Sequence, residues 1–453
     1  MKKYSPLAFL FSLLFAVSAY AGEGRYTLPL TGGGWSLWLD KEASWQNDRL
    51  YLPHEITDLS LLPVNTPTGG WQALNDNLDA VSVEVPGTVE EYLTTSDNPR
   101  PEDFKGVSWW YRKITIPADQ ANKRHLIYFE SVRMRAEVYL DGKLVAYDLI
   151  GETPFHVDIT KEAKPGTEQL LAVRVTNPGG NFHWQDFDIQ KWGEYNIPPA
   201  RSFSGIIGRV KLESVNPVFI SDIYMQNTPE PTKVNAIISF TNETPSSVKQ
   251  DVELTVSEKN RPDKVVFRQL LKHVSFPPGK REMMIPVSVS DAKLWDLDTP
   301  ELYTCNIQIK KGKNTLDRDK KNFGFRWFSA EGVGTDAVLR LNGRRVMLRS
   351  AISWGYFPVT GLIATPEMAE KQVLTAKKLG LNMLNFHRCI GSPVVLEKTD
   401  ELGLLYYEEP GSFHSANHDP FIRTIVNEKL KRMVHRDRSH PSLIIFNLIN
   451  EFG

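Results

Sequence analysis

The sequence predicts a protein of several domains, in which two β-sandwiches precede a region of alternating strands and helices. At roughly 150 residues per domain, a chain of 453 residues is long enough for three domains. From residue 22 to residue 328 the apolar residues recur mostly at every second position in short runs, which is typical of strands. After residue 328, strand-like and helix-like runs alternate, which favours βα units around a parallel sheet.

The composition is that of a globular protein with little net charge. Hydrophobic residues make up 41% of the chain, charged residues 24% and aromatic residues 11%, which is too much apolar surface for a disordered chain. Lys and Arg number 53 and Asp and Glu number 54, so the formal net charge is −1. Because no dense run of Lys or Arg supplies a local field either, we expect no nucleic-acid partner.

Residues 1–21 have the pattern of a signal peptide. Two lysines precede an apolar run over residues 7–17, and Ala19 and Ala21 place small residues at the positions that a signal peptidase reads. This run is shorter than the roughly 20 residues of a membrane span, so cleavage before Gly22 is preferred to an uncleaved anchor helix. We therefore expect an exported protein, periplasmic or extracellular, with no membrane partner after cleavage.

The chain has only two cysteines, although an exported protein meets oxidising conditions. Cys305 and Cys389 fall in different expected domains. Two unpaired, buried thiols are therefore preferred to a disulfide between them. Neither cysteine has a His and an acidic residue close by in sequence that would indicate a nucleophile.

The β-rich part divides near residue 216. In the first part, runs over residues 110–116, 136–140 and 170–175 predict strands, and Asp141-Gly142 predicts a two-residue hairpin turn. A run over residues 208–212 predicts its last strand. The Trp-rich loops of this larger part favour a jelly-roll sandwich. The second part, of about 110 residues with roughly seven short strands including residues 252–256, fits an immunoglobulin-like sandwich.

The alternating region begins with a predicted strand over residues 345–348. Its later elements are predicted as helices over residues 366–379, 393–402 and 421–437, separated by strands over residues 382–386, 404–408 and 443–446.

Motifs in all of these regions resemble glycoside hydrolase family 2, in the family's own order. Its sugar-binding domain is similar to this chain over residues 106–113, 138–143, 153–160 and 171–175. Its sandwich domain, the entry to its TIM barrel and its acid/base motif are similar over residues 294–303, 323–326, 341–346, 433–442 and 450–451. Collinear motifs in three domains are more specific than any one of them. The resemblance implies a retaining exo-β-glycosidase acting on a terminal β-linked galactoside, glucuronide or mannoside.

The patterns and the resemblance together predict four segments. They are a signal peptide over residues 1–21, a jelly-roll sugar-binding-like domain over 22–216, an immunoglobulin-like sandwich over 217–329 and the first half of a (β/α)8 TIM barrel over 330–453. A retaining glycosidase needs two carboxyl groups about 5 to 5.5 Å apart. In the family the nucleophilic Glu comes from strand seven, so we expect this chain to be an incomplete portion that is inactive by itself.

Glu451 is the expected acid/base catalyst and Asn450 an expected substrate ligand. Glu451 follows the fourth strand of the alternating region, at the C-terminal mouth where barrel enzymes carry their chemistry. Partial desolvation there raises the pKa of a Glu, which keeps it protonated until it donates to a glycosidic oxygen. The Asn450 amide can donate to a neighbouring sugar hydroxyl. A lone Asn-Glu is more often an ordinary loop, and the preceding residues 436–442 reverse that preference.

Further candidates end the earlier strands. His387 and Arg388 are expected to grip substrate hydroxyls or a carboxylate, with a satisfied core or supporting histidine as an equally weighted interpretation of His387. Trp354 and Tyr356 can offer a flat apolar face to a sugar ring, although aromatics there pack in a core at least as often. Glu409, where the family has an acidic residue, is expected to orient the catalytic acid or a bound ion; the alternative is a solvated strand end.

The chain departs from the family pattern at several positions. Ser439 stands where the family usually has Asn before His-Pro, and Phe446 and Asn447 stand where it has Trp followed by a small residue. On the second strand, Asn385 falls on the family's Arg, and Arg388 falls on its His. These departures give weight to a second hypothesis, a non-catalytic carbohydrate-binding or scaffolding protein with a vestigial barrel.

No cofactor or metal is expected. The other histidines of the alternating region do not form a paired metal spacing such as His-Glu-x-x-His. The glycines at 32–34 precede Trp35 in a strand-like context and are not followed by a helix or by Lys, so they do not predict a phosphate loop. The expected partner is a carbohydrate substrate, and an oligomer is left open.

Overall fold

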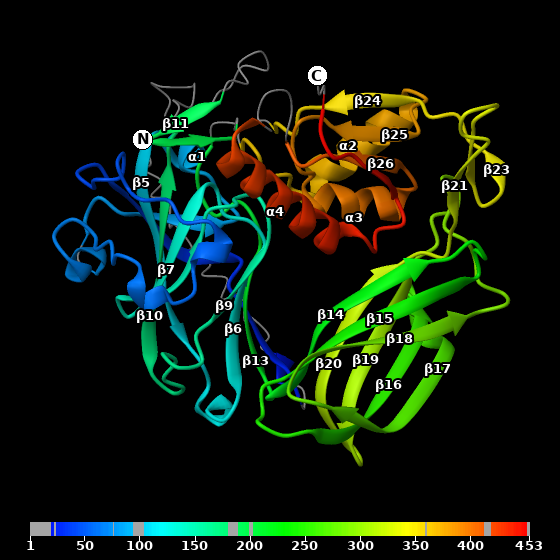
Figure 1. Ribbon diagram of the computed structural model, residues 1–453, viewed down its shortest axis with the longest axis horizontal. Coiled ribbons are helices and arrows are strands. Elements are labelled where there is room, and N and C mark those ends of the chain that lie inside the picture. The colour runs from blue at the N-terminus through cyan, green and yellow to red at the C-terminus, as the bar shows by residue number, and fades with distance from the viewer. Residues whose placement is uncertain are drawn as a thin grey trace, which may run out of the picture.

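The computed structural model describes residues 20–21, 24–75, 77–93, 104–179, 189–198, 203–357, 360–411 and 418–450. Figure 1 shows two β-sandwiches and a third body of helices on a sheet, with α4 between the helices of this body and the first sandwich. Among the described residues, no helix combines the length and the apolarity of a membrane span. The expected signal peptide, apart from the backbone of residues 20–21, and Glu451 lie outside the described residues.

The first sandwich has two antiparallel sheets. One sheet has the order β1-β2-β13-β6-β9, with bounds Tyr20–Ala21, Tyr26–Pro29, Val210–Val215, Arg124–Phe129 and Phe155–Asp158. The other has the order β4-β3-β5-β10-β7-β8, with bounds Val81–Val85, Gly32–Asp40, Gly106–Thr115, Glu168–Asn177, Arg135–Leu140 and Lys143–Asp148. Helix α1 (Val89–Leu93) and the hairpin of β11 (Gln190–Trp192) and β12 (Tyr195–Ile197) complete it.

The predicted hairpin turn of this sandwich is confirmed. Asp141 and Gly142 join β7 to β8 with φ of 48° and 80°, the positive values that a primed turn requires at both positions. Between the two sheets, alternate side chains such as Trp35, Trp110 and Phe129 form one buried core.

The second sandwich has the predicted seven strands. One sheet has the order β14-β15-β18, with bounds Val218–Asn227, Lys233–Asn242 and Gly279–Ser288. The other has the order β17-β16-β19-β20, with bounds Arg261–Phe276, Val248–Glu258, Tyr303–Lys311 and Asn314–Phe323. Cys305 lies in the core between them, where burial raises its pKa to about 12. Cys305 and Cys389 are both buried and unpaired, which confirms the preference for free thiols.

The third body contains the predicted parallel sheet. Its order is β24-β25-β26-β27, with bounds Ser350–Ser353, Met383–Phe386, Leu405–Glu408 and Leu443–Phe446, and all three pairings are parallel. Helices α2 (Pro366–Lys378), α3 (Pro393–Leu402) and α4 (Pro420–Asp437) match their predicted ranges to within a residue. The side chains of Thr365 and Asp419 cap α2 and α4 by accepting hydrogen bonds from the first turn of each helix.

The predicted strand over residues 345–348 is wrong. Arg344–Arg345 is strand β23 of a separate antiparallel sheet with β21 (Phe328–Glu331) and β22 (Val338–Leu341), and the N–H of Val346 continues this pairing by donating to the Leu339 carbonyl. The first parallel strand is β24, five residues later. Val346 and Leu348 pack against a buried cluster that joins Trp295 of the second sandwich to Met383 and Leu405 of the parallel sheet.

The second sandwich is fastened to the underside of the third body. The Nε1 of Trp295, which is fully buried, donates to the Asp400 carbonyl on α3 at 2.8 Å. Arg326 donates to the carbonyls of Pro441 and Leu443, at 3.0 and 2.8 Å, where the chain enters β27. Lys377 on α2 donates to the Leu297 carbonyl at 2.8 Å. Hydrogen bonds from side chains to backbone carbonyls across this joint therefore fix the orientation of the parallel sheet relative to the second sandwich.

Residues 439–442 hold the start of β27 against α3. Asp400 accepts from the Ser442 N–H at 3.0 Å and lies 2.6 Å from Nδ1 of His440. Burial alone would lower the pKa of His440, but the Asp400 carboxylate outweighs burial and raises that pKa above its ordinary value. Ser439, one of the departures from the family pattern, accepts a hydrogen bond from the Met225 N–H of β14 at 3.2 Å.

We expect Gly403→Ala to lower the thermal unfolding midpoint more than Gly380→Ala does. Both glycines follow a helix with positive φ, of 73° and 79°, so both replacements carry the strain of about 1 to 2 kcal/mol for an L residue in this region. Only at Gly403 would the new Cβ meet a backbone atom, the Leu297 oxygen, at 2.4 Å, whereas Gly380 has open space. Equal midpoints for the two variants would contradict the close packing of α3 on the second sandwich.

The His440–Asp400 pair is expected to make stability depend on pH. Because the pKa of His440 is raised in the folded state, its stabilisation is complete below the unfolded pKa of about 6.5 and is lost as the pH rises through the folded pKa. The urea midpoint of the wild type should therefore fall as the pH rises above about 6.5. This fall should be smaller in His440→Gln, and it should be unchanged in the control His54→Gln, whose side chain is exposed. Parallel curves for the wild type and His440→Gln would contradict this assignment.

Candidate functional site

The candidate site lies where the four parallel strands end. Trp354 follows β24, His387 follows β25, Glu409 follows β26 and Asn447 follows β27. Parallel strands end at the same edge of a sheet, so segments far apart in sequence meet there. Side chains also alternate between the two faces of a strand. All four residues continue the face that carries Ile352, Asn385, Tyr407 and Ile445, whereas the other face, with Leu384, Phe386 and Tyr406, packs into a core with the helices.

His387 is held on two sides. Its Nδ1 is 3.3 Å from Oε1 of Glu409, and the ring of Trp354 contacts it edge to face, with centroids 4.7 Å apart and an interplanar angle of 87°. Its N–H donates to the Ser353 carbonyl at 2.9 Å. The His387 side chain is 13% exposed, so the ring is held by its neighbours and still reaches the surface of the site.

Glu409 is the central residue of this cluster. Its side chain is 1% exposed, which contradicts the alternative of a solvated strand end. Oε1 faces His387, and Nδ2 of Asn447 is 3.5 Å from Oε2. Asn447 also donates its N–H to the Glu408 carbonyl at 2.8 Å, which keeps the end of β27 beside β26. Glu409 therefore links the ends of three strands.

Two buried amide atoms at the strand ends have no hydrogen-bond partner among the described residues. One is Oδ1 of Asn385, an acceptor on this face of β25, and the other is Nδ2 of Asn450, a donor beyond the end of β27. Buried polar groups are nearly always hydrogen-bonded, so such atoms at a strand end are natural contacts for a polar ligand. Asn450 was selected from the sequence. Asn385 was noted only as a departure from the family pattern, and its place on the same face as His387 was the signal that could have singled it out.

The remaining sequence candidates surround this cluster. Arg388 has a φ of 57°, a positive value that is uncommon for a residue other than Gly. The ring of Tyr356 lies 5.9 Å from Phe203 of the first sandwich, so an aromatic contact from another domain reaches the loop after β24. Sequence reasoning did not select Phe203. Over the described part of the chain, no group of three or more His, Cys, Asp or Glu is arranged to hold a metal ion.

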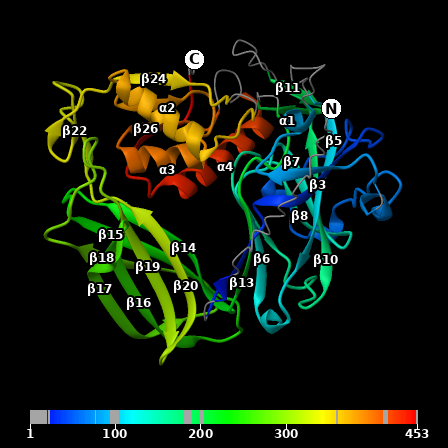
Figure 2. The same ribbon diagram turned by 180° about the vertical axis from the view of Figure 1, so that it is seen from behind.

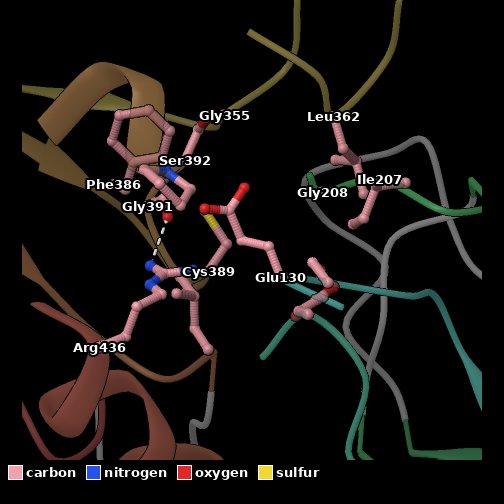
Figure 3. Close-up of a pocket in the computed structure, with 14 residues that line it drawn as sticks. Glu130, Ile207, Gly208, Gly355, Leu362, Phe386, Cys389, Gly391, Ser392 and Arg436 are labelled. Carbon is pink, nitrogen blue, oxygen red and sulfur yellow. Dashed lines mark hydrogen bonds between the residues drawn. The ribbon is translucent and has the colours of Figure 1, made fainter. Parts of the chain in front are cut away.

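A buried ion cluster supports the loop after β25. Arg436 of α4 binds Asp437 through Nε and Nη2 and lies 3.4 Å from Glu408. It also donates to the Gly391 carbonyl at 2.8 Å, the bond drawn in Figure 3. Glu408 accepts from the Gly391 N–H at 3.0 Å. Burial, with the neighbouring Asp437 carboxylate, raises the pKa of Glu408 well above its usual range. Glu408 and Arg436 together bind the N–H and the carbonyl of Gly391, so the cluster fixes this part of the loop.

The cavity drawn in Figure 3 lies beside the site and is small. It has a volume of about 60 Å³ and lies between Glu130 and Gly208 of the first sandwich and Phe386, Cys389 and Gly391 of the third body. A water molecule needs roughly 10 to 15 Å³ by this measure, so the cavity holds a few waters. None of the four strand-end residues described above lines it.

Comparison with known proteins places two of the three bodies directly. Residues 71–198 match the family model described as "Glycosyl hydrolases family 2, sugar binding domain", and residues 218–326 match "Glycosyl hydrolases family 2". Both matches fall inside single expected domains, and the domain limits themselves stay predictions.

Relatives and solved structures extend this similarity. A β-galactosidase of Thermoanaerobacter pseudethanolicus is 28% identical over 356 residues, or 78% of this chain and 46% of that protein. A β-glucuronidase of Formosa agariphila is 25% identical over 362 residues, or 76% of this chain and 36% of that protein.

Among structures, a Bacteroides uniformis β-glucuronidase has a TM-score of 0.71 at 20% identity, covering 93% of this chain and 47% of that one. This chain spans about a third to a half of the length of the curated relatives that it matches. Matches to the models of two successive domains, with relatives that extend beyond them, show that the chain belongs to glycosyl hydrolases family 2.

Proposed function

We propose that this chain is part of a glycosidase that hydrolyses terminal β-linked sugars with retention of configuration. One observation carries the proposal: Oδ1 of Asn385, a buried acceptor without a partner among the described residues, lies on the same sheet face as the cluster around Glu409, and Nδ2 of Asn450, a buried donor without one, follows the end of β27. An acceptor and a donor at the strand ends, with an ordered His and a Trp, suit a ligand rich in hydroxyl groups. Relatives named β-glucuronidase and β-galactosidase support this substrate class.

We also propose that β24 to β27 are the first four strands of a (β/α)8 barrel. The strands lie side by side in their order along the chain, each pairing is parallel, and a helix separates each strand from the next. In such barrels the C-terminal ends of the strands carry the catalytic groups. The candidate site occupies this edge of the sheet.

In the proposed reaction Glu451 is the general acid. Its protonated carboxyl donates a proton to the glycosidic oxygen as the bond to the anomeric carbon breaks, and the resulting carboxylate then takes a proton from the attacking water. Retention requires a second carboxylate that forms the glycosyl intermediate, and we assign no residue of this chain to that role. Asn450 would hold the hydroxyl next to the reacting carbon, while His387, Arg388 and Trp354 would position the sugar.

Glu409 has a positioning role in this proposal. Its carboxylate contacts His387 and Asn447, so it sets the orientation of the histidine rather than meeting the sugar itself. Whether the sugar is a galactoside, a glucuronide or a mannoside stays open, and export rests on the pattern of residues 1–21.

The alternative of a non-catalytic carbohydrate-binding protein rested on three unusual residues. Two of them have structural partners here. The Ser439 hydroxyl bonds to β14 and the Asn447 amide contacts Glu409. Their identity is therefore accounted for by packing, and we prefer the enzyme.

Glu451→Gln in the full-length gene product should lower kcat on substrates with a poor leaving group by about 10²- to 10⁴-fold, the usual contribution of general acid–base catalysis. Protonation matters less when the leaving group is already a good one, so the loss on 4-nitrophenyl glycosides should be smaller. Assays with alkyl and 4-nitrophenyl β-glucuronides and β-galactosides measure both, with Glu401→Gln on the surface of α3 as the control. Unchanged turnover of the alkyl glycosides would leave the non-catalytic alternative.

Glu409→Ala should lower the free energy of unfolding by about 1.5 to 3 kcal/mol, because it removes a buried carboxyl group that accepts from Asn447 and lies 3.3 Å from Nδ1 of His387. Glu409→Gln keeps the shape and one acceptor oxygen and should cost less. Chemical denaturation measures both, with the exposed Glu42→Ala as the control. If Glu409→Ala is as stable as the control, the cluster does not hold the strand ends together.

A further inference from the structure

A second recess lies where the two sandwiches and α4 meet, away from the strand ends. Its volume is about 510 Å³, within the range of ligand sites. Its walls come from β6, β9 and β13 of the first sandwich, β14 and β20 of the second sandwich, and the C-terminal half of α4. Figures 1 and 2 show these elements facing one another from the three bodies. We call it the junction cleft.

The junction cleft is rich in positive charge. Seven Lys and Arg side chains line it against three acidic ones. The cations are Arg25, Lys211, Lys320, Lys321, Lys431, Arg432 and Arg436, and the acidic residues are Glu213, Asp222 and Asp319. The whole chain has a net charge of only −1, so this concentration of cations is local to the cleft.

Part of this charge is used by the fold and part remains at the surface. Arg25 binds Asp317 and Asp319, and Arg432 binds Asp148 at 2.7 Å. Arg436 belongs to the buried ion cluster with Asp437, and Lys211 pairs with Glu213 at 3.0 Å, so four of the seven cations are already paired. In contrast, the side chain of Lys431 on α4 is 75% exposed and lies 3.7 Å from Glu428, a pair of little strength. Lys320 on β20 is exposed as well. Opposite walls of the cleft therefore offer ammonium groups to an anion.

The cleft also offers flat rings and neutral polar groups. The rings of Tyr128 and His156 lie 5.0 Å apart on adjacent strands, and Lys211 lies over the Tyr128 ring. A neighbouring cavity of about 640 Å³ shares the lining residues Arg25, Lys211, Glu213, Asp319 and Lys320, so the two form one groove. The second cavity adds the hydroxyl and amide side chains of Thr27, Thr255, Asn306 and Gln308, with the cation of Arg318.

We propose that the junction cleft binds an anionic oligosaccharide, whose carboxylate or sulfate groups meet the lysines and whose hydroxyls meet the amide and hydroxyl side chains. Extended shape, dispersed cations and neutral hydrogen-bonding groups suit such a ligand better than a single phosphate. Lys431 lies about 16 Å along α4 from its start at Pro420. None of the four strand-end residues of the candidate site lines the cleft. This site is therefore separate from the proposed catalytic centre.

Isothermal titration calorimetry on the chain tests this proposal. The probes are tetragalacturonic acid, a chondroitin sulfate tetrasaccharide, neutral cellotetraose and inorganic sulfate. At least one acidic tetrasaccharide should bind about tenfold more tightly than cellotetraose and sulfate, and its affinity should fall between about 0.02 M and about 0.15 M salt. The carboxylated and sulfated probes distinguish the two kinds of anionic group. Equal binding of cellotetraose, or no binding by either acidic probe, overturns the proposal.

Variants locate the binding. The double change Lys320→Gln with Lys431→Gln removes an exposed cation from each wall and should weaken binding of the acidic probe about tenfold. Lys313→Gln, at an exposed turn outside the cleft, is the matched control and should leave binding unchanged. Glu451→Gln should leave it unchanged too, which separates this site from the proposed catalytic one. Unaltered binding in the double variant, with retained folding by circular dichroism, contradicts the assignment.

Discussion

The carboxylate of Glu409 is the contact on which the candidate site depends. It is buried at the end of β26 and meets His387 from β25 on one side and Asn447 from β27 on the other. A buried charge is costly unless it is paired and hydrogen-bonded, so these contacts fix the relative positions of three strand ends. Trp354, which packs against His387, connects the end of the fourth strand, β24, to this cluster. Asn385, on the same face of β25 as His387, then borders a site whose geometry is already set.

This edge of the sheet is in turn held by the two sandwiches. The second sandwich bonds to backbone carbonyls at α3 and at the entry to β27, through Trp295 and Arg326. The first sandwich binds α4 through ion pairs of Asp148 with Arg432 and Glu152 with Lys429. Ion pairs cross the joint with the second sandwich as well, because Asp222 pairs with Arg438 and Lys259 pairs with Glu401.

The sequence predicted the elements better than it predicted their contacts. Helix and strand limits in the third body came from the alternation of strand-like and helix-like runs, a local feature that the fold kept. The strand over residues 345–348 failed because Val346 and Leu348 are apolar for packing on a cluster of residues far away in sequence, which no local pattern records. The pairing of His387 with Glu409 depends on strand register. Sequence could place both residues at strand ends and could not bring them into contact.

The burial of Trp295 against α3 has a consequence for how such proteins diversify. Its indole reaches a carbonyl of another domain, and Gly403 packs so closely on Leu297 that no larger residue fits. A second sandwich exchanged between relatives by recombination would bring its own surface to this joint, and α3 would then have to change with it. We therefore expect the second sandwich and helix α3 to be inherited together, and not as separate domains.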